Sequence, residues 1–307
     1  MKSENQFGNL AGRSTKAKSR KLGRSEYLTP RDSQILNYLW RWKLASSTSI
    51  HEAINKLASK YATYKILDKL ERSGFIGSYF DYEERFYVWQ LTSKGFAGIR
   101  KKFDEMAEEG FLSGNPNHDR LVQAFHLGEW STYNTPNAIF WTEQEMRRFD
   151  VAYYPDWVPK SKEHRPDGYT RLVGAKKVFT LAFEVELTTK RISKYEATLQ
   201  FFKHARQIDR VYWLIGNTYT RDQILKAKTC VNDESFNYHV FVELEDFQKN
   251  GWDAMITNER SERVHTLREN MQEICGDFCR DIMETFRGSS TIHVHLNNLK
   301  VIGKSKT

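Results

Sequence analysis

The 307-residue sequence predicts an α+β protein, with a small helical domain that ends in a β-hairpin and a following α/β domain built around a central mixed sheet. The first observation is a change of periodicity, from helical between residues 28 and 74 to strand-like up to residue 91. The second is the alternation of helical segments with short apolar strands after residue 115. The boundaries we predict are 1–26 for an arm, 27–110 and 115–250 for the two domains, and 251–307 for a helical segment with a basic tail.

The first 26 residues predict a disordered basic arm. They hold seven Lys and Arg residues against Glu4 and Glu26, so +5 of the formal net charge of +8 lies there. They are rich in Ser and Gly and nearly free of large apolar side chains. Such a segment cannot form a core, and its charge favours a polyanionic partner, although a merely solubilising tail has the same composition.

The composition of the whole chain favours a cytoplasmic protein without membrane insertion. Hydrophobic residues make up 39% of the sequence, which is enough for real cores, and no apolar run approaches the length of a membrane span. The three cysteines are too few for a disulfide framework, so a reducing compartment is expected.

The first domain begins with a helix at Thr29-Pro30, because Thr is a good N-cap and Pro suits the first helical position. A second short helix is expected after a cap at Ser47 or Thr48, and a third from about Lys60 to Arg72. Gly74 ends the third helix, strands at 75–78 and 86–89 flank a turn, and residues 91–96 start a fourth helix.

The pattern resembles the winged helix-turn-helix family in two stretches, Leu70-Glu71-Arg72-Ser73-Gly74-Phe75-Ile76 and Leu91-Thr92-Ser93-Lys94-Gly95. The resemblance implies that the third helix enters the major groove of double-stranded DNA, while use in protein contacts alone is the alternative. The wing tip is acidic, so we do not expect it to enter the minor groove. The DNA-binding residues expected on the outward face of the third helix are Lys60, Tyr61, Thr63, Tyr64, Lys65 and Lys69.

The second domain reads as helices and strands in alternation. A helix is expected from His118, and another at 141–148 with Thr142 as N-cap and Glu145 completing a capping box. Two paired strands follow between 166 and 187, then a helix at 192–208, a strand at 210–216, a helix at 222–230 and a last strand at 238–242. The segment from 252 to 287 is otherwise expected to be helical.

Three carboxylates in the paired strands predict a metal site. Glu184 and Glu186 lie two apart on one strand and therefore share a face, and a hairpin would bring Asp167 beside them. Clustered carboxylates are unfavourable unless a hard cation neutralises them. The alternative is that both Glu side chains lie on the solvated face of a half-exposed strand.

This element order, with Pro166-Asp167 and Glu184-Val185-Glu186, resembles the PD-(D/E)xK nuclease superfamily and implies a restriction-endonuclease-like fold. The resemblance implies that Mg²⁺ or Mn²⁺ binds Asp167, Glu184 and Glu186, with Glu186 in the position of the usual Lys. Lys190 would replace that missing cation, and His164 and Arg165 would contact phosphate. A further acidic residue is expected from the preceding helix, Glu145 in preference to Glu129.

Together, the two domains resemble the replication-relaxation family, which includes MobC-type plasmid relaxases, on Trp141-Thr142-Glu143, Arg165-Pro166-Asp167-Gly168 and Glu184-Val185-Glu186-Leu187-Thr188. The resemblance implies a metal-dependent endonuclease that nicks a plasmid origin, with relaxosome proteins and a secretion coupling protein as partners. One alternative is a non-catalytic winged-helix regulator with a degenerate nuclease domain. The other is an endonuclease subunit similar to TnsA, in which the winged helix follows the nuclease.

Overall fold

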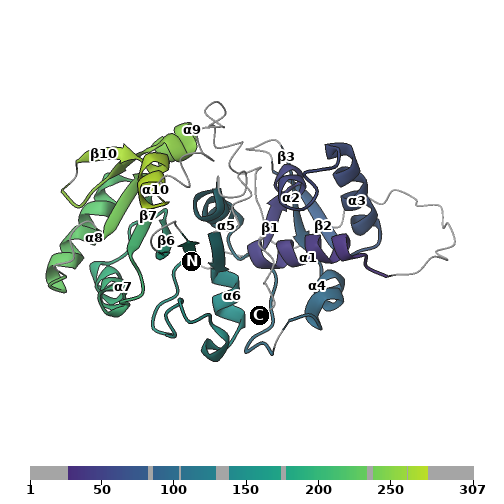
Figure 1. Ribbon diagram of the computed structural model, residues 1–307, viewed down its shortest axis with the longest axis horizontal. Coiled ribbons are helices and arrows are strands. Elements are labelled where there is room, and N and C mark those ends of the chain that lie inside the picture. The colour runs from purple at the N-terminus through teal and green to yellow at the C-terminus, as the bar shows by residue number, and fades with distance from the viewer. Residues whose placement is uncertain are drawn as a thin grey trace, which may run out of the picture.

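The computed structural model describes residues 27–81, 86–103, 105–128, 138–173, 178–233, 238–260 and 262–275. These residues form two sheets, each with its own helices, at opposite ends of the molecule (Figure 1). The predicted α+β class with a mixed central sheet is therefore confirmed. No helix among these residues is long and apolar enough to cross a membrane.

The N-terminal unit has the chain order helix, strand, helix, helix, strand, strand, helix. Its three strands form an antiparallel sheet in the order β1-β3-β2. The elements are α1 (Pro30–Trp42), β1 (Leu44–Ser46), α2 (Ser47–Ile54), α3 (Lys60–Arg72), β2 (Ile76–Asp81), β3 (Phe86–Leu91) and α4 (Ser93–Arg100).

Local side-chain chemistry sets the helix ends of this unit. Thr29 caps α1 in a capping box with Asp32, and Pro30 is the first helical residue, as predicted. The cap of α2 is Ser46 rather than the predicted Ser47 or Thr48. The predicted span of α3 is confirmed, and Gly74 follows it with a φ of +74°, which a residue without Cβ adopts readily.

The C-terminal unit is built on a seven-stranded sheet in the order β10-β9-β8-β7-β6-β5-β4. The pairs β6–β7 and β7–β8 are parallel and the other neighbours are antiparallel. Its elements are α5 (Pro116–Val122), a π-helical turn η1 (Gln123–Leu127), β4 (Ala138–Thr142), α6 (Glu143–Arg148), β5 (Gly168–Val173), β6 (Val178–Glu186), α7 (Ile192–His204), β7 (Arg210–Ile215), α8 (Thr218–Cys230), β8 (His239–Glu243), α9 (Leu244–Asn250), β9 (Met255–Thr257), β10 (Arg263–Thr266) and α10 (Leu267–Cys275).

The sheet is wider than the sequence predicts. Strand β4 was not expected, and Trp141 belongs to it rather than to the helix that follows. The segment after residue 252 was expected to be helical, but β9 and β10 extend the sheet there, so β8 is not the last strand. Both added strands are only three or four residues long, which is too short for a clear alternating pattern.

The two faces of the sheet are covered by different helices. Phe183 of β6 contacts Phe125 of η1, and Phe125 in turn contacts Phe247 of α9. Trp213 of β7 is packed against Phe202 of α7 on the other face. Glu184 pairs in register with Trp213, and paired residues share a face, so Glu184 faces the α7 side.

One continuous hydrophobic core runs through both units. Trp40 of α1 lies with its ring centroid 4.3 Å from that of Phe103 and 5.7 Å from that of Phe149. The end of the first predicted domain is packed into this contact, because the Gly110 carbonyl accepts hydrogen bonds from the Trp40 indole and the Gln144 amide. The two units are therefore joined by a packed interface within the described residues.

Candidate active site

The hairpin of β5 and β6 brings Asp167 beside Glu184. Gly168 pairs with Phe183 across the two antiparallel strands, so the next pair outward would join Asp167 and Glu184. The Oδ2 atom of Asp167 accepts a hydrogen bond of 2.7 Å from the backbone N–H of Val185, between the two Glu residues. The predicted approach of Asp167 to this strand is confirmed.

Glu184 and Glu186 lie on one face of β6, and both are buried, each only 5% exposed. The reading in which they occupy a solvated face is therefore wrong. The strands β6, β7 and β8 are parallel, and these carboxylates stand at the carboxyl end of β6. In open sheets with parallel strands, this end is where ligands commonly bind.

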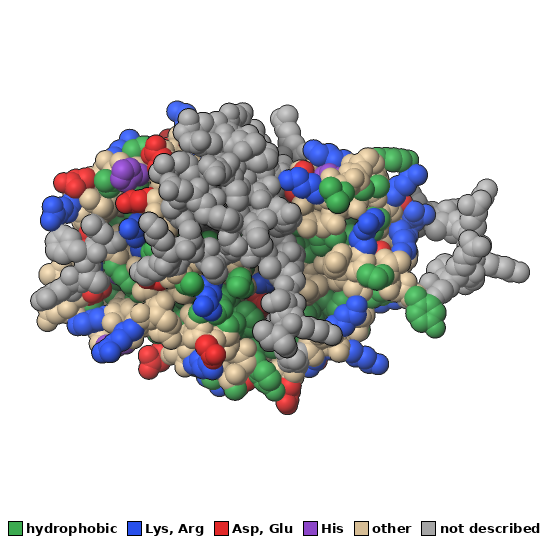
Figure 2. Space-filling view, in the orientation of Figure 1, with side chains coloured by type: hydrophobic (Ala, Val, Ile, Leu, Met, Phe, Trp, Pro, Cys, Tyr) green, Lys and Arg blue, Asp and Glu red, His purple; other side chains and the backbone are tan. Residues whose placement is uncertain are grey.

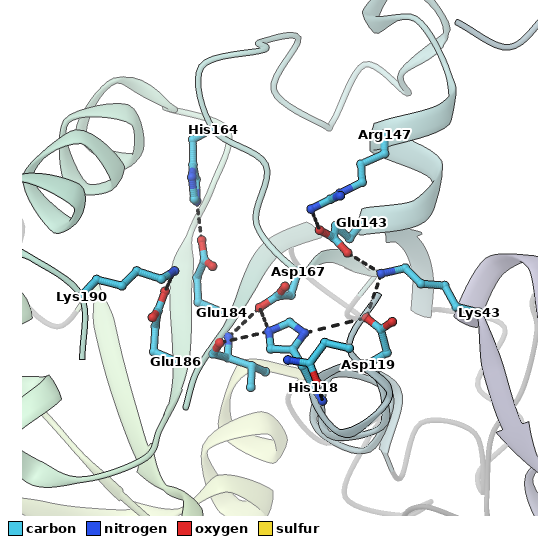
Figure 3. Close-up of polar contacts among 12 residues, drawn as sticks. Lys43, His118, Asp119, Glu143, Arg147, His164, Asp167, Glu184, Glu186 and Lys190 are labelled. Atoms are coloured by element: carbon cyan, nitrogen blue, oxygen red, sulfur yellow. Dashed lines mark hydrogen bonds and ion pairs between the residues drawn. The ribbon is translucent and has the colours of Figure 1, made fainter. Parts of the chain in front are cut away.

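Each of the two Glu side chains has a basic partner (Figure 3). The Nε2 atom of His164 lies 2.5 Å from Oε1 of Glu184, and the amine of Lys190 donates to Oε1 of Glu186. Burial raises the pKa of Glu184 to about 7 although His164 opposes the shift, and burial also raises the pKa of Glu186 against the opposing Lys190. Burial lowers the pKa of His164, but Glu184 outweighs this and raises it overall.

His118 of α5 is a site residue that the sequence did not single out. Its Nε2 atom lies 3.2 Å from the Val185 carbonyl oxygen and 3.6 Å from Oδ2 of Asp167, and its Nδ1 atom is 3.8 Å from Asp119. Burial by itself lowers the pKa of His118, but Asp119 and Asp167 raise it to about 10. His118 is therefore a cation at neutral pH, placed between two carboxylates (Figure 3). The only hint in the sequence was its position at the start of a helix that precedes the strand pair.

The acidic residue expected from the preceding helix is not Glu145. Its Oε2 atom accepts from the Arg41 guanidinium and from the backbone N–H of Thr142, which is the capping box. The carboxylate of Glu145 is therefore bound by α1 and by the N-cap of its own helix rather than placed among the carboxylates of β6. The acidic residue of the preceding helix that lies near the site is Asp119, which is next to His118. Glu129 lies outside the described residues.

The two predicted phosphate contacts differ in their surroundings. His164 faces Glu184 and lies against the rings of Phe201 and Phe202 in α7. Arg165 is exposed and within hydrogen-bonding reach of the Tyr154 hydroxyl. Arg165 therefore remains accessible to a ligand, whereas His164 is held by the site itself.

A close backbone approach explains the glycine after Asp167. A Cβ atom built on Gly168 would lie 2.0 Å from Cε1 of His126, far inside van der Waals contact. The His126 ring is buried and fixed by a 3.0 Å hydrogen bond between Nε2 and the Tyr169 carbonyl oxygen. Gly168 thus lets the start of β5 lie directly on this ring, which sets the position of Asp167.

The outward face of α3 carries most of the predicted DNA-binding residues. Tyr61 and Tyr64 are exposed, and the Lys65 amine lies 4.6 Å from the centre of the Tyr61 ring. The prediction that Thr63 lies on this outward face is wrong, because Thr63 is buried and its hydroxyl forms hydrogen bonds with His51 and Asn55. Lys69 is half exposed, and its amine forms a 2.7 Å ion pair with Asp32. Figure 2 shows Lys and Arg side chains gathered at the end of the molecule that carries α3.

The donor chemistry of the strand end fits a hard divalent cation, since Mg²⁺ and Mn²⁺ prefer carboxylate oxygens. The side chains are not gathered around one point, however. Across the ranges that the structure describes, no three His, Cys, Asp or Glu side chains are close enough together to hold a metal ion. A metal ion would have to compete with His164 for Glu184 and with Lys190 for Glu186.

The chain matches no protein-family model, and no curated protein is significantly similar to it. Two solved structures of the restriction endonuclease FokI are similar at 12% sequence identity. The match to the DNA-bound structure covers 70% of this chain and 43% of the FokI chain, with a TM-score of 0.23. The match to the other structure covers 74% of this chain and 45% of the FokI chain, with a TM-score of 0.26. The chain thus spans less than half the length of either FokI chain, and TM-scores this low support no conclusion about fold or function.

Proposed function

We propose that this protein is a DNA endonuclease that depends on a divalent metal ion. The observation that carries the proposal is the burial of Asp167, Glu184 and Glu186 together at the carboxyl end of β6. Burying several carboxylates at one place is unfavourable, and folds keep such groups mostly where they bind or react. Nicking at a plasmid origin, which the family resemblance implies, is the narrower form of this proposal.

The residues around the carboxylates would have different roles in cleavage. When bound, a divalent ion would polarise a phosphodiester oxygen and acidify a water molecule. Asp167 and Glu184 are the residues that would hold it, because they are neighbours across the hairpin. Lys190, on Glu186, would orient the attacking water and balance charge. Arg165, exposed beside the site, would contact the phosphate backbone.

DNA binding would come from the N-terminal unit. The exposed Tyr61, Tyr64 and Lys65 on α3 offer stacking and phosphate or base-edge contacts to a major groove. The order of helices and strands in this unit supports its use as a winged helix. The basic residues of the arm at 1–26 lie outside the described residues and would add sequence-independent attraction.

The experiment is a cleavage assay on supercoiled plasmid with the full chain in Mg²⁺, Mn²⁺ or EDTA. We expect nicking in either metal and none in EDTA, and we expect Asp167→Asn and Glu184→Gln to abolish it while DNA binding persists. Asp32→Asn is the control, because Asp32 is equally buried but lies in α1, in an ion pair with Lys69. Cleavage that survives in both site variants would overturn the proposed site.

A second function is favoured by one observation. All three carboxylates already have protein partners, as they would in a domain that binds DNA without cutting it. A wild-type protein that binds duplex DNA but neither nicks plasmid nor binds Mn²⁺ would identify it as a non-catalytic DNA-binding protein.

A further inference from the structure

Lys43 lies at the end of α1 in the N-terminal unit, yet its side chain reaches two elements of the C-terminal unit. Its Nζ atom is 2.8 Å from Oδ1 of Asp119 and 2.7 Å from Oε2 of Glu143. The side chain is largely buried, with 13% exposed. Its backbone has a φ of +66°, which is uncommon for a residue with a Cβ atom.

The first of these contacts leads to the carboxylate of Asp167. Asp119 faces His118, its neighbour in α5, and the ring of His118 lies between Asp119 and Asp167. The same ring nitrogen that faces Asp167 also faces the carbonyl oxygen of Val185. Figure 3 shows Lys43, Asp119, His118 and Asp167 following one another in this order.

The second contact leads to the backbone of the same residue. Glu143 is the first residue of α6, and its backbone N–H donates a 3.2 Å hydrogen bond to the carbonyl oxygen of Asp167. Its side chain is held by Lys43 through one oxygen and by Arg147 through the other, at 2.7 Å each. Lys43 thus binds two of the segments that contact Asp167, one at its carboxylate and one at its main chain.

We propose that Lys43 is a positioning residue, through which the N-terminal unit fixes Asp167 in the carboxylate site of the C-terminal unit. The inference rests on the proposed function, because the position of Asp167 matters for metal binding. Neither unit contains the whole site, since the cation that holds α5 and α6 together comes from the end of α1.

Simple electrostatics predicts the opposite effect on metal binding, which makes the proposal easy to test. Removing a positive charge from the surroundings of a carboxylate site strengthens the attraction of that site for a divalent cation, so Lys43→Met should raise the affinity if Lys43 acts through its charge alone. If Lys43 acts by positioning, the same substitution should lower the affinity, because α5 and α6 no longer hold Asp167 in place.

The experiment measures Mn²⁺ binding to the full chain by calorimetry, with no DNA present. We expect Lys43→Met to weaken Mn²⁺ binding at least tenfold. Lys228→Met is the matched control, because Lys228 also forms a largely buried ion pair, with Glu259, at the other end of the sheet. The control should lose thermal stability but keep wild-type Mn²⁺ affinity. Unchanged or tighter Mn²⁺ binding in Lys43→Met would overturn the proposal.

A second measurement separates this proposal from the proposed function. The ring signals of His118 in an NMR spectrum of the metal-free protein, assigned with His118→Gln, should move in Lys43→Met and stay in Lys228→Met. If the wild type binds no Mn²⁺, the proposed function fails, and these signals alone decide the role of Lys43. If Lys43→Met does not fold, Asp119→Asn replaces it, since this variant breaks the first route and leaves the pair of Lys43 with Glu143. Unmoved His118 signals would overturn the proposal in either variant.

Discussion

Glu184 shows how a single residue sets the chemistry of the site. A carboxylate this deeply buried is disfavoured in its charged form, which is why its pKa rises to about 7 from an ordinary 4.5. His164 compensates part of that penalty. Folding therefore favours the protonated form of Glu184, and the contribution of Glu184 to the stability of the metal-free protein should fall as pH rises from 4.5 through 7.

This pKa predicts that metal binding strengthens with pH. A metal ligand must be deprotonated, and a group with a pKa of about 7 gains roughly tenfold in its charged fraction between pH 6 and pH 8. We expect Mn²⁺ to bind about tenfold more tightly at pH 8 than at pH 6, and its stabilisation of the fold to grow over the same interval. Calorimetry and thermal unfolding measure both. Glu184→Gln should bind weakly at either pH, and an equally steep pH dependence in that variant would assign the proton to another group.

Gly168 is the second residue whose role is visible only in three dimensions. Gly168→Ala forces the new methyl group against the His126 ring, which cannot retreat without breaking its bond to the Tyr169 carbonyl. We predict a loss of about 1–3 kcal/mol in the free energy of unfolding, typical of overpacking, and a loss of metal affinity. Gly114→Ala is the control, since nothing lies within 4 Å of the position of its Cβ atom. Equal stability of the two variants in urea would mean that His126 moves freely.

At the scale of elements, α3 separates exposed side chains, which we propose contact DNA, from side chains that hold the fold. Lys65 and Tyr64 point outward, while Lys69 is tied to Asp32 at the start of α1. We predict that Lys65→Ala and Tyr64→Ala each cost roughly 1–3 kcal/mol in binding to a cognate duplex and less on random DNA. Lys69→Ala should change DNA affinity less than Lys65→Ala. Titrations by fluorescence anisotropy with both duplexes measure this, and equal losses on both would mean that α3 grips only the backbone.

The elements that could be predicted from the sequence are those with strong local signals. Thr29, Pro30 and Gly74 mark the ends of α1 and α3, and the alternating apolar residues around Glu184 mark β6. Strands β4, β9 and β10 carry no such signals. Strands β9 and β10 are only three and four residues long, and β4 pairs with β5, whose partner residues lie 26 to 34 positions further along the chain. Pairing, rather than propensity, creates these strands.

The candidate site could be predicted only where its residues are close in the sequence. Asp167 and Glu184 are joined by one hairpin, so their approach follows from sequence spacing. His118 reaches Asp167 from 49 positions away and Lys43 reaches Asp119 from 76, and no spacing rule connects them. Glu145 illustrates the converse, because its capping signal predicts the start of α6 correctly, but the cap commits its side chain to Thr142 and Arg41.

At the scale of the whole molecule, the two units are tied by a common core and by charged pairs, and the net charge is +8 with +5 of it in the first 26 residues. We predict that DNA binding is steeply salt-dependent, with log K falling by about 0.9 per phosphate contacted for each unit of log salt. Deleting residues 1–26 should flatten this slope and leave sequence preference nearly unchanged. Binding isotherms at several salt concentrations test this, and an unchanged slope would show that the arm does not touch DNA.

The backbone N–H and C=O groups of Val185 contact side chains on the edge where a neighbouring strand would normally pair with them. Strand β5 starts at Gly168, opposite Phe183, so Val185 lies two residues beyond the last residue of β6 that pairs with β5. Asp167 takes the N–H and His118 faces the C=O, so two site residues complete a ladder that the strand leaves unfinished. The amide proton of Val185 should consequently exchange slowly with deuterium in the wild type. In Asp167→Ala it should exchange many times faster while the amide protons of β7 keep their protection, so one backbone proton would report the integrity of the site without metal, DNA or cleavage.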